Sequence, residues 1–366
     1  MNPLEQLHEA GVSIWLDMLS RDLLDSGTFT TLVADCAVTG ATSNPTIFAK
    51  AITGSDAYDD QLHAAVASGL DTPQELFFAV ALEDVRRAAD VLRPVYGVGG
   101  GRDGFVSFEC TPDVADDTDA TILQALELWQ RLARPNVMIK VPATDAGIPA
   151  IEELTSRGVN VNVTLLFSVA RYEQVIDAYI NGLERRSAAG LPVDGMASVA
   201  SFFVSRVDAK ADASLPAGSA LRGRVAIANA QVAYARYRER FAGGRWRALT
   251  AVGARPQRPL WASTAPKDPA YSDVLYVESL IAPDVINTMP QATLRAFADH
   301  GTVGRALDAD PREAIALLGG AHSAGIDLDA ITADLERDGV RSFCDSYQEL
   351  LDRIAAKVGD DIVRLR

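Results

Sequence analysis

The sequence has few cysteines, and this scarcity excludes two ways of stabilising a fold. Cys36, Cys110 and Cys344 lie far apart, and the chain of 366 residues has no CxxC or cysteine–histidine cluster. A structural zinc site is therefore not expected, and we predict a protein without a metal. A sparse, odd number of cysteines is more typical of a reducing compartment than of a disulfide framework.

Long apolar runs are also missing. No apolar stretch reaches the roughly 18 residues that a membrane-spanning helix needs. The N-terminus, MNPLEQLHEAG, lacks a basic segment followed by an apolar run, so it does not resemble a secretory signal. We predict a cytoplasmic protein that makes no membrane contact.

Positive charge is in short supply, because 34 basic residues stand against 49 acidic ones and the formal net charge is −15. A phosphate backbone needs clustered lysine and arginine, so we expect no nucleic-acid partner. A small anionic ligand stays compatible, since one or two local cations can hold it. The chain has only five lysines, and the position of each is therefore informative: Lys50, Lys140, Lys210, Lys267 and Lys357.

Short apolar or β-branched runs alternate with longer stretches of helical period. The predicted strands are Val12–Asp17, Val38–Asn44, Phe105–Glu109, Val137–Val141, Val159–Leu165, Met196–Val204, Pro259–Ser263 and Val285–Thr288. Apolar stripes predict helices over residues 78–92, 122–133, 169–183, 221–235 and, near the C-terminus, 340–358. The span 45–102 must hold more than one helix.

Strands that alternate with helices pair in parallel through crossover connections. Eight such units favour a closed (β/α)₈ TIM barrel over an open sheet. We therefore predict a single barrel domain over residues 1–366, with additional helices that include one at the C-terminus.

A glycine pattern near residue 100 resembles a dinucleotide-binding motif but stands in the wrong context. Gly99, Gly101 and Gly104 fit G-x-G-x-x-G. A dinucleotide site needs this motif to leave a strand and to open a helix. Here a helix ends near Leu92 and a strand starts near Phe105, so we predict a loop and no such cofactor.

Polar side chains stand inside or at the ends of strands that are otherwise apolar. In a (β/α)₈ barrel the carboxyl ends of the strands meet at one mouth, where the chemistry is carried. The polar candidates are Asp17, Asn44, Glu109, Lys140, Asn162, Thr164 and Ser201, and Phe203 shares the strand face of Ser201.

Lys140 is the most informative of them, because an ammonium is costly to bury between Ile139 and Val141. It could form an internal ion pair with Glu109 or Asp17. It could instead be a nucleophilic amine that forms a Schiff base with a carbonyl. The converging carboxylates, amides and hydroxyls favour the second interpretation, since aldol chemistry needs a base, an acid and donors for sugar hydroxyls.

Several other candidates have a structural alternative. Asp17 and Glu109 could be strand-end caps or arginine partners, although a pair that flanks one lysine favours proton transfer. Asn44 could belong to an Asn-Pro turn, Asn162 could be a satisfied core amide, and Arg206 could be a solvated side chain past a strand end.

Four stretches resemble the transaldolase family: GATSNPTIF, VMIKVPATDAGIPAIEEL, VNVNVTLLFS and SFFVSRVD. The resemblance runs from about Val12 to Pro290, and WASTAPKDPAYSDVLYVESLIAPDVINTMP is similar to the seventh- and eighth-strand region of the longer bacterial members. It implies a barrel with a Schiff-base lysine, no metal, no organic cofactor and sugar-phosphate substrates. The implied reaction moves a dihydroxyacetone unit from sedoheptulose 7-phosphate to glyceraldehyde 3-phosphate, giving erythrose 4-phosphate and fructose 6-phosphate.

The resemblance also implies roles for individual residues. Lys140 matches the Schiff-base lysine, and Asp17 matches the aspartate that handles the proton of the C4 hydroxyl. Glu109 matches the glutamate that, with Thr164, orders a proton-shuttling water. The remaining matches hold the substrate: Asn44, Asn162 and Ser201 bind hydroxyls of the dihydroxyacetone unit, Phe203 packs by the site, and Arg206 binds phosphate.

The sequence departs from the family at one point. Many members carry a second phosphate-binding arginine in an A-S-x-R motif after the seventh strand, whereas Ala262-Ser263-Thr264 continues here to Lys267. Lys267 could replace that arginine as a point charge without its bidentate fork, or it could be a solvated loop lysine.

Two other functions are alternatives. The nearest is a fructose-6-phosphate aldolase of the same superfamily, whose members carry Gln and Tyr where this chain has Glu109 and Phe203. The other is a catalytically silent barrel that serves as a scaffold, against which Lys140, Asp17 and Glu109 argue together. The sequence leaves the oligomeric state open, a homo-oligomer included.

Overall fold

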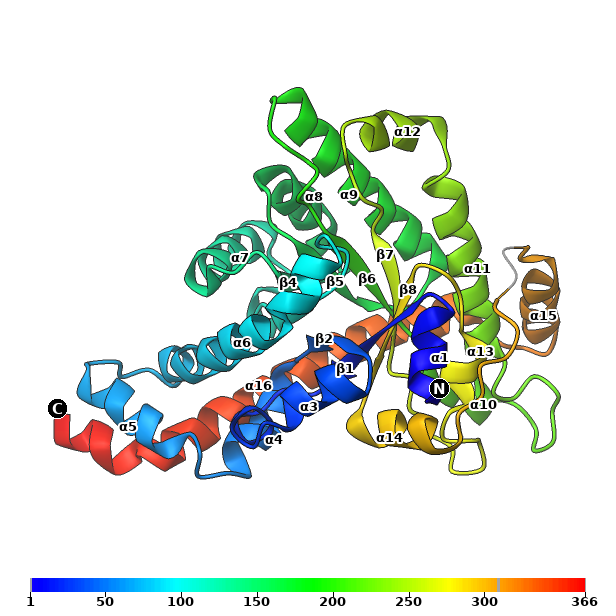
Figure 1. Ribbon diagram of the computed structural model, residues 1–366. Helices are drawn as coiled ribbons and strands as arrows, with labels where there is room; N and C mark the ends of the chain where they lie inside the picture. Colours follow the sequence, from blue (N-terminus) through cyan, green and yellow to red (C-terminus); the bar gives the residue numbers. More distant parts are fainter. Residues whose placement is uncertain (1, 308–309, 366) are drawn as a thin grey trace.

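A computed structural model describes residues 2–307 and 310–365. Parallel strands close into a barrel in the order β1 to β8, with β8 returning to β1 (Figure 1). The predicted barrel of eight strands is therefore confirmed. The strands are β1 Val12–Asp17, β2 Val38–Thr42, β3 Phe105–Glu109, β4 Val137–Pro142, β5 Val161–Leu166, β6 Ser198–Phe203, β7 Arg258–Ala262 and β8 Val285–Met289.

Helices surround the barrel, and the chain continues in further helices beyond the last strand. Those of the first half are α1 Pro3–Glu9, α2 Arg21–Asp25, α3 Thr28–Asp35, α4 Pro45–Thr53, α5 Asp59–Ala67, α6 Pro73–Val98, the 3₁₀ turn η1 Pro112–Val114, α7 Thr118–Leu132 and α8 Gly147–Arg157. Those of the second half are α9 Val169–Ala188, α10 Ser205–Ala213, α11 Val225–Arg240, α12 Gly244–Ala251, α13 Leu275–Ser279, α14 Gln291–His300, α15 Arg312–Ser323 and α16 Leu328–Leu365. The span 45–102 holds α4, α5 and α6, as predicted.

The end of β2 differs from the prediction for a local reason. The predicted strand ran to Asn44, but β2 ends at Thr42. The Asn44 side chain accepts a hydrogen bond from the Ile47 backbone N–H at 2.9 Å, and Pro45 occupies the first position of α4. An asparagine N-cap followed by proline favours the start of a helix, so the chain leaves the sheet earlier than its apolar pattern suggests.

β5 is irregular where it approaches the mouth of the barrel. Its pairing with β6 shifts register between Val163 and Leu166, and Leu165 has a left-handed backbone with φ 53°. A bulge of this kind redirects a strand and is frequent next to active sites. Here it lies directly beside Thr164, one of the predicted catalytic residues.

The C-terminal helix is longer than its apolar stripe predicted. α16 starts at Leu328, well before the stripe that begins at Val340, and its buried residues include Phe343, Tyr347 and Ile354. It packs against α4, α5, α6, α10 and the end of β5, so it crosses helices from both halves of the barrel. Figure 1 shows α16, in orange to red, running beside α4 and ending near α5.

The glycine loop lies at the amino end of the barrel, opposite the mouth. It connects α6 to β3, the helix-to-strand order that argued against a dinucleotide site. Gly104 has φ 84°, and a Cβ there would lie 2.4 Å from the Tyr96 backbone nitrogen, so this position needs glycine. Its neighbour Asp103 accepts a 2.7 Å hydrogen bond from the Trp15 indole and so ties the loop to the barrel interior.

The sequence predicts no membrane-spanning helix, no metal site and no disulfide framework, and the described part of the chain can be compared with these predictions. There, no single helix is long and apolar enough to cross a membrane, although α15 and α16, bent by 90° at their junction, pass that test as a pair. No group of three or more His, Cys, Asp or Glu in that part is placed to hold a metal ion. The three cysteines are free thiols.

Candidate active site

The predicted catalytic lysine lies at the carboxyl end of β4 between two other predicted residues. In the strand register Lys140 is opposite Glu109 of β3 on one side and Asn162 of β5 on the other. Parallel neighbours in a barrel present such residues at the same height, so three strands converge on one point. Lys140 itself is only 5% exposed.

The Lys140 ammonium has two partners. Its Nζ donates to Glu109 Oε2 at 3.0 Å and to the Ser43 carbonyl at 2.9 Å. Burial raises the pKa of Glu109, and the Asp17 charge raises it further, while Lys140 opposes both effects. The structure therefore contains the ion pair considered as a structural alternative. The same pair is suited to proton transfer, because moving one proton to Glu109 leaves a neutral amine beside a neutral acid.

Asp17 stands at the end of β1 and is held by hydroxyls. Thr42 of β2 donates to its Oδ1 at 2.7 Å, and Thr288 of β8 lies 2.8 Å from the same Thr42 oxygen. Burial raises the pKa of Asp17, and the Thr42 hydrogen bond opposes this rise, followed by the charges of Lys140, Arg206 and Lys267. Asp17 is therefore in electrostatic reach of every predicted cation of the site.

Asn162 and Ser201 form one hydrogen-bonded chain with a residue that the sequence did not single out. Ser201 donates to Asn162 Oδ1 at 2.7 Å, and Asn162 donates through Nδ2 to Ser107 Oγ at 2.8 Å. All three side chains are buried. The chain fixes the direction of the Asn162 amide, so its orientation toward the barrel interior is set before any ligand arrives.

Thr164 differs from these residues because its hydroxyl has no partner. Its Oγ1 is buried and makes no hydrogen bond to the described residues. Buried polar atoms are seldom left in this state. Thr164 is opposite Pro142, two residues beyond Lys140 in β4, and an unused buried hydroxyl at this height fits the expected role of holding a reacting water.

Asn44 is only partly available to a ligand. Its Oδ1 caps α4 through the Ile47 N–H, as the structural alternative expected, while its Nδ2 has no partner among the described residues. Its Nδ2 can therefore donate to a ligand at the mouth, while Oδ1 keeps the cap and has one lone pair left to accept.

Two further cations act on Asp17, one from α10 and one from the loop after β7. Arg206, in the first turn of α10, stacks its guanidinium over the Phe203 ring at 5.3 Å, and Phe203 in turn contacts Phe167. Burial lowers the pKa of Arg206. Burial also lowers the pKa of Lys267, and the Arg206 charge adds to this effect while Asp17 opposes it. The Arg206 charge thus acts on Lys267, and the charges of both cations act on Asp17.

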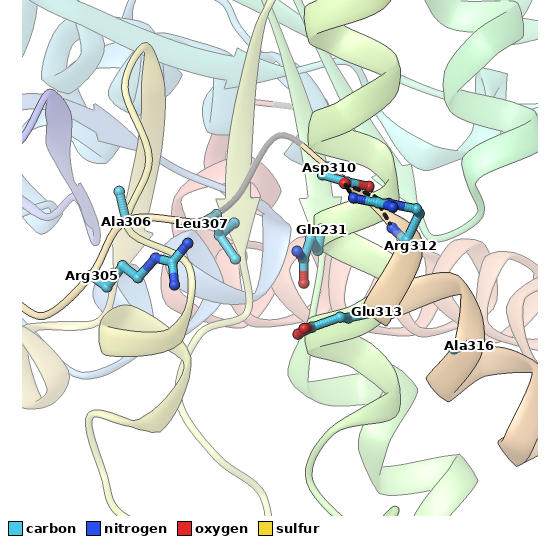
Figure 2. A pocket seen from close by; sticks show the side chains of 8 residues that line it. All are labelled: Gln231, Arg305, Ala306, Leu307, Asp310, Arg312, Glu313 and Ala316. Atoms are coloured by element: carbon cyan, nitrogen blue, oxygen red, sulfur yellow. Dashed lines mark hydrogen bonds and ion pairs between the residues drawn. The ribbon is translucent and has the colours of Figure 1, made fainter.

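The region of Lys267 is also open. Lys267 lines a cavity of about 450 Å³ with residues of α10 and of the loop after β7, among them Ser205, Asp268 and Tyr271. A larger hollow of about 670 Å³ lies elsewhere, between α11 and α15 (Figure 2). Gln231 and Glu313 line that hollow, and none of the predicted site residues do. We therefore assign no role in the predicted chemistry to it.

Sequence analysis missed four residues that hold the predicted ones in place. They are Thr42, Ser43, Ser107 and Thr288, and all are at most 3% exposed. Thr42 and Ser43 belong to the quoted GATSNPTIF stretch, and Thr288 lies in the eighth predicted strand, so a signal was present. Their contacts depend on which strands are neighbours, and the closure of β8 onto β1 brings Thr288 to Thr42, which in turn contacts Asp17.

The comparisons with known proteins identify the family. The family model described as Transaldolase/Fructose-6-phosphate aldolase matches residues 14–354. A transaldolase of Frankia alni is 49% identical over 98% of both chains. A transaldolase of Acidothermus cellulolyticus is 50% identical over 100% of this chain and 98% of its own length, and one of Thermobifida fusca is 49% identical over 98% of both chains. The chain therefore belongs to the transaldolase/fructose-6-phosphate aldolase family.

Proposed function

We propose that the barrel mouth is the active site of a transaldolase that acts on sugar phosphates through a Schiff base on Lys140. The single observation that carries this proposal is the Lys140–Glu109 pair, a buried amine and a buried acid 3.0 Å apart at the carboxyl ends of β4 and β3. The proposed reaction moves a dihydroxyacetone unit from sedoheptulose 7-phosphate to glyceraldehyde 3-phosphate. The products are erythrose 4-phosphate and fructose 6-phosphate.

Imine formation needs a neutral amine and a route for two protons. Glu109 takes a proton from Lys140, and the free amine attacks the C2 carbonyl of the donor to form a carbinolamine. Loss of water then gives the imine, with Glu109 returning the proton to the departing hydroxyl. Thr164, whose hydroxyl is buried without a partner, orients the water on this path.

Cleavage of the C3–C4 bond is the task of Asp17. Its carboxylate takes the proton of the C4 hydroxyl, the C4–O bond becomes a carbonyl, and the electrons of C3–C4 pass into the imine on Lys140. The aldehyde product leaves, and the acceptor aldehyde adds by the reverse of these steps. Asn162, Ser201 and the Asn44 amide donor bind hydroxyls of the dihydroxyacetone unit that stays on the lysine.

Arg206 and Lys267 hold the phosphate at the outer end of the substrate. The Arg206 charge lowers the pKa of Lys267, both cations oppose the rise in the pKa of Asp17, and Lys267 borders a cavity. A point charge at Lys267 lacks the planar fork of an arginine, so Arg206 supplies the directional contact.

The aldolase alternative is less well supported. Relatives that are 49–50% identical over nearly the whole chain are transaldolases, and the chain keeps Glu109 and Phe203 where the aldolase subgroup has other residues. The test is to incubate the protein with fructose 6-phosphate, with and without erythrose 4-phosphate, and to measure both sedoheptulose 7-phosphate and free dihydroxyacetone. Acceptor-dependent transfer is expected. Release of dihydroxyacetone at the same rate without acceptor would identify an aldolase instead.

A further inference from the structure

Two hydroxyls that sequence analysis did not select lie in line behind the proposed base. Thr288 of β8, Thr42 of β2 and Asp17 of β1 form a chain, with 2.8 Å between the two hydroxyl oxygens and 2.7 Å from Thr42 to Asp17 Oδ1. Both threonines are 3% exposed. The three residues come from neighbouring strands, since β1 pairs with β2 on one side and with β8 on the other.

The chemistry of the three groups fixes the direction of this chain. A threonine hydroxyl has one hydrogen to donate, and an ionised carboxylate can only accept. Thr42 must therefore give its hydrogen to Asp17, and its own oxygen must accept from Thr288. The hydrogen bonds consequently run from Thr288 to Thr42 to Asp17, and each polarises the next.

The chain also distinguishes the two oxygens of the carboxylate. Oδ1 accepts from Thr42, whereas Oδ2 has no hydrogen-bond partner within residues 2–307 and 310–365. We propose that Thr42 and Thr288 are positioning residues that occupy Oδ1 and reserve Oδ2 as the atom that exchanges the proton with the C4 hydroxyl. This proposal rests on the proposed function, in which Asp17 is the base for C3–C4 cleavage.

The proton balance of the step follows directly. In cleavage the C4 hydroxyl proton moves to Oδ2, the C4–O bond becomes a carbonyl, and the C3–C4 electron pair enters the imine on Lys140. In the reverse step, when the acceptor adds, its carbonyl oxygen gains the Oδ2 proton as the new C3–C4 bond forms. Thr42 can donate to Oδ1 throughout, because that oxygen remains an acceptor in both protonation states.

Four charged groups also face Asp17 and stay unchanged in the variants proposed below. Lys140 comes from β4, Arg206 from α10 and Lys267 from the loop after β7, and all three oppose the rise in the Asp17 pKa that burial causes. Glu109 of β3 is the fourth, and its own pKa is raised in part by Asp17. Among the contacts that favour the carboxylate, the Thr42 hydrogen bond acts most strongly.

The test uses Thr42→Val, Thr42→Ser and Thr288→Val, with Thr155→Val as the matched control. Thr155 is buried on α8, and its hydroxyl makes no hydrogen bond to the described residues, so this control removes a hydroxyl without breaking a chain. Three quantities are measured on the full chain: kcat/KM for transfer from fructose 6-phosphate, the pH profile of kcat/KM, and the rate at which borohydride traps added dihydroxyacetone on the protein.

Thr42→Val is expected to lower kcat/KM roughly tenfold to a hundredfold, as for a hydrogen bond to a charged group. Its acid limb should move up by roughly one pH unit, because loss of a donor disfavours the carboxylate. Thr288→Val should show a smaller change in the same direction, roughly twofold to fivefold. Thr42→Ser should retain most of the rate, and Thr155→Val should match the unchanged protein.

Trapping of dihydroxyacetone separates this proposal from a general defect, because imine formation on Lys140 does not use Asp17. Trapping should proceed at the same rate in all variants. If Thr42→Val leaves the acid limb in place, or slows trapping as much as transfer, the positioning role is wrong while the transaldolase function stands. If the unchanged protein neither transfers nor traps, the proposed function itself fails. If Thr42→Val does not fold, the pH profiles and trapping rates of Thr288→Val and Thr42→Ser test the positioning role instead.

Discussion

Arg206 combines a fixed orientation with a lack of fixed charge partners, which is what a phosphate-binding residue needs. Its guanidinium is stacked on Phe203, and it has no salt bridge in the part of the chain that the structure describes. Stacking orients the planar fork, and burial strengthens its interaction with an anion. The cost of desolvating it is visible as a lowered pKa for Arg206.

We predict that Arg206→Ala weakens the binding of phosphorylated substrates more than it slows the chemistry. The phosphate lies far from the reacting carbons, so the contact is equal in ground and transition states and KM should rise more than kcat falls. A charge-assisted hydrogen bond contributes about 1.5–3 kcal/mol, which corresponds to a roughly ten- to hundredfold loss in kcat/KM. The measurement is kcat/KM for glyceraldehyde 3-phosphate and for unphosphorylated glyceraldehyde.

Arg247→Ala is the matched control for that experiment. Arg247 is exposed on α12, which precedes β7 and therefore lies at the amino end of the barrel. The Arg247→Ala variant removes the same charge far from the mouth, and kcat/KM should stay unchanged for both acceptors. Equal losses for both acceptors in Arg206→Ala would show that Arg206 does not recognise phosphate.

At this scale the sequence indicated the proposed reacting groups better than the groups that hold them. Lys140 and Glu109 stand out because a charge inside an apolar strand has few explanations, and the structure places them in contact. Thr42 and Thr288 do not stand out, because threonine is common in strands. The hydrogen bonds of Thr42 and Thr288 form only when the barrel closes, and a local sequence pattern contains no information on which distant strands become neighbours.

At the scale of elements, the buried carboxyl of Asp208 connects α10 to two neighbouring helices. Asp208, in the first turn after Arg206, accepts from the Ala226 N–H of α11 at 2.7 Å and from the Tyr276 hydroxyl of α13 at 2.9 Å. Burial raises the pKa of Asp208 from 3.8 to about 6, in spite of these two hydrogen bonds. The residue therefore ties three helices together and changes charge near neutral pH.

We predict that Asp208 makes the free energy of unfolding fall as pH rises from about 4 to 6. Its pKa is higher in the folded state, so the folded protein binds more protons in this window, and stability is lost as pH rises through the folded pKa. The full effect is at most about 3 kcal/mol. The measurement is the urea midpoint at several pH values for the unchanged protein and for Asp208→Asn.

The asparagine variant removes one titrating group and leaves the other buried carboxyls in place. The difference between the two pH profiles therefore reports Asp208 alone. A difference that stays constant between pH 4 and pH 7 would contradict the raised pKa.

The boundaries of elements were less predictable than their order. All eight strands were expected near their observed positions, because apolar alternation with helices is a strong signal. β2 was predicted two residues too long, ending at Asn44 where the structure ends it at Thr42, because the cap at Asn44 outweighs the strand pattern. The bulge in β5 has no counterpart in the sequence pattern, since it depends on pairing with β6.

At the scale of the whole molecule, the main question is whether the long C-terminal helix folds together with the barrel. α16 packs on α4, α5 and α6, which follow β2, on the turn η1 after β3, and on α10, which follows β6, so both halves of the barrel contact it. We propose that residues 1–366 form one folding domain, as the sequence suggested, with α16 as part of its core.

We predict that Ile354→Ala, in α16, lowers the free energy of unfolding of the entire protein by about 2–4 kcal/mol. Ile354 is 0% exposed and belongs to the main hydrophobic core, so truncation leaves a cavity. Leu351→Ala, a few residues earlier and only partly buried, should cost less than half as much. Calorimetry should show one transition that shifts as a unit, whereas a separate low-temperature transition in Ile354→Ala would mean that α16 folds independently of the barrel.

The central claim, that Lys140 carries the chemistry, is tested most directly by trapping its imine. The protein is incubated with fructose 6-phosphate, reduced with borohydride, digested and analysed by mass spectrometry, beside the Lys140→Arg variant. We predict one dihydroxyacetone adduct per chain on the peptide that contains Lys140, and none in the variant, because a guanidinium cannot form the imine. An adduct on Lys267 or Lys210, or no adduct in a protein that transfers dihydroxyacetone, would contradict the account.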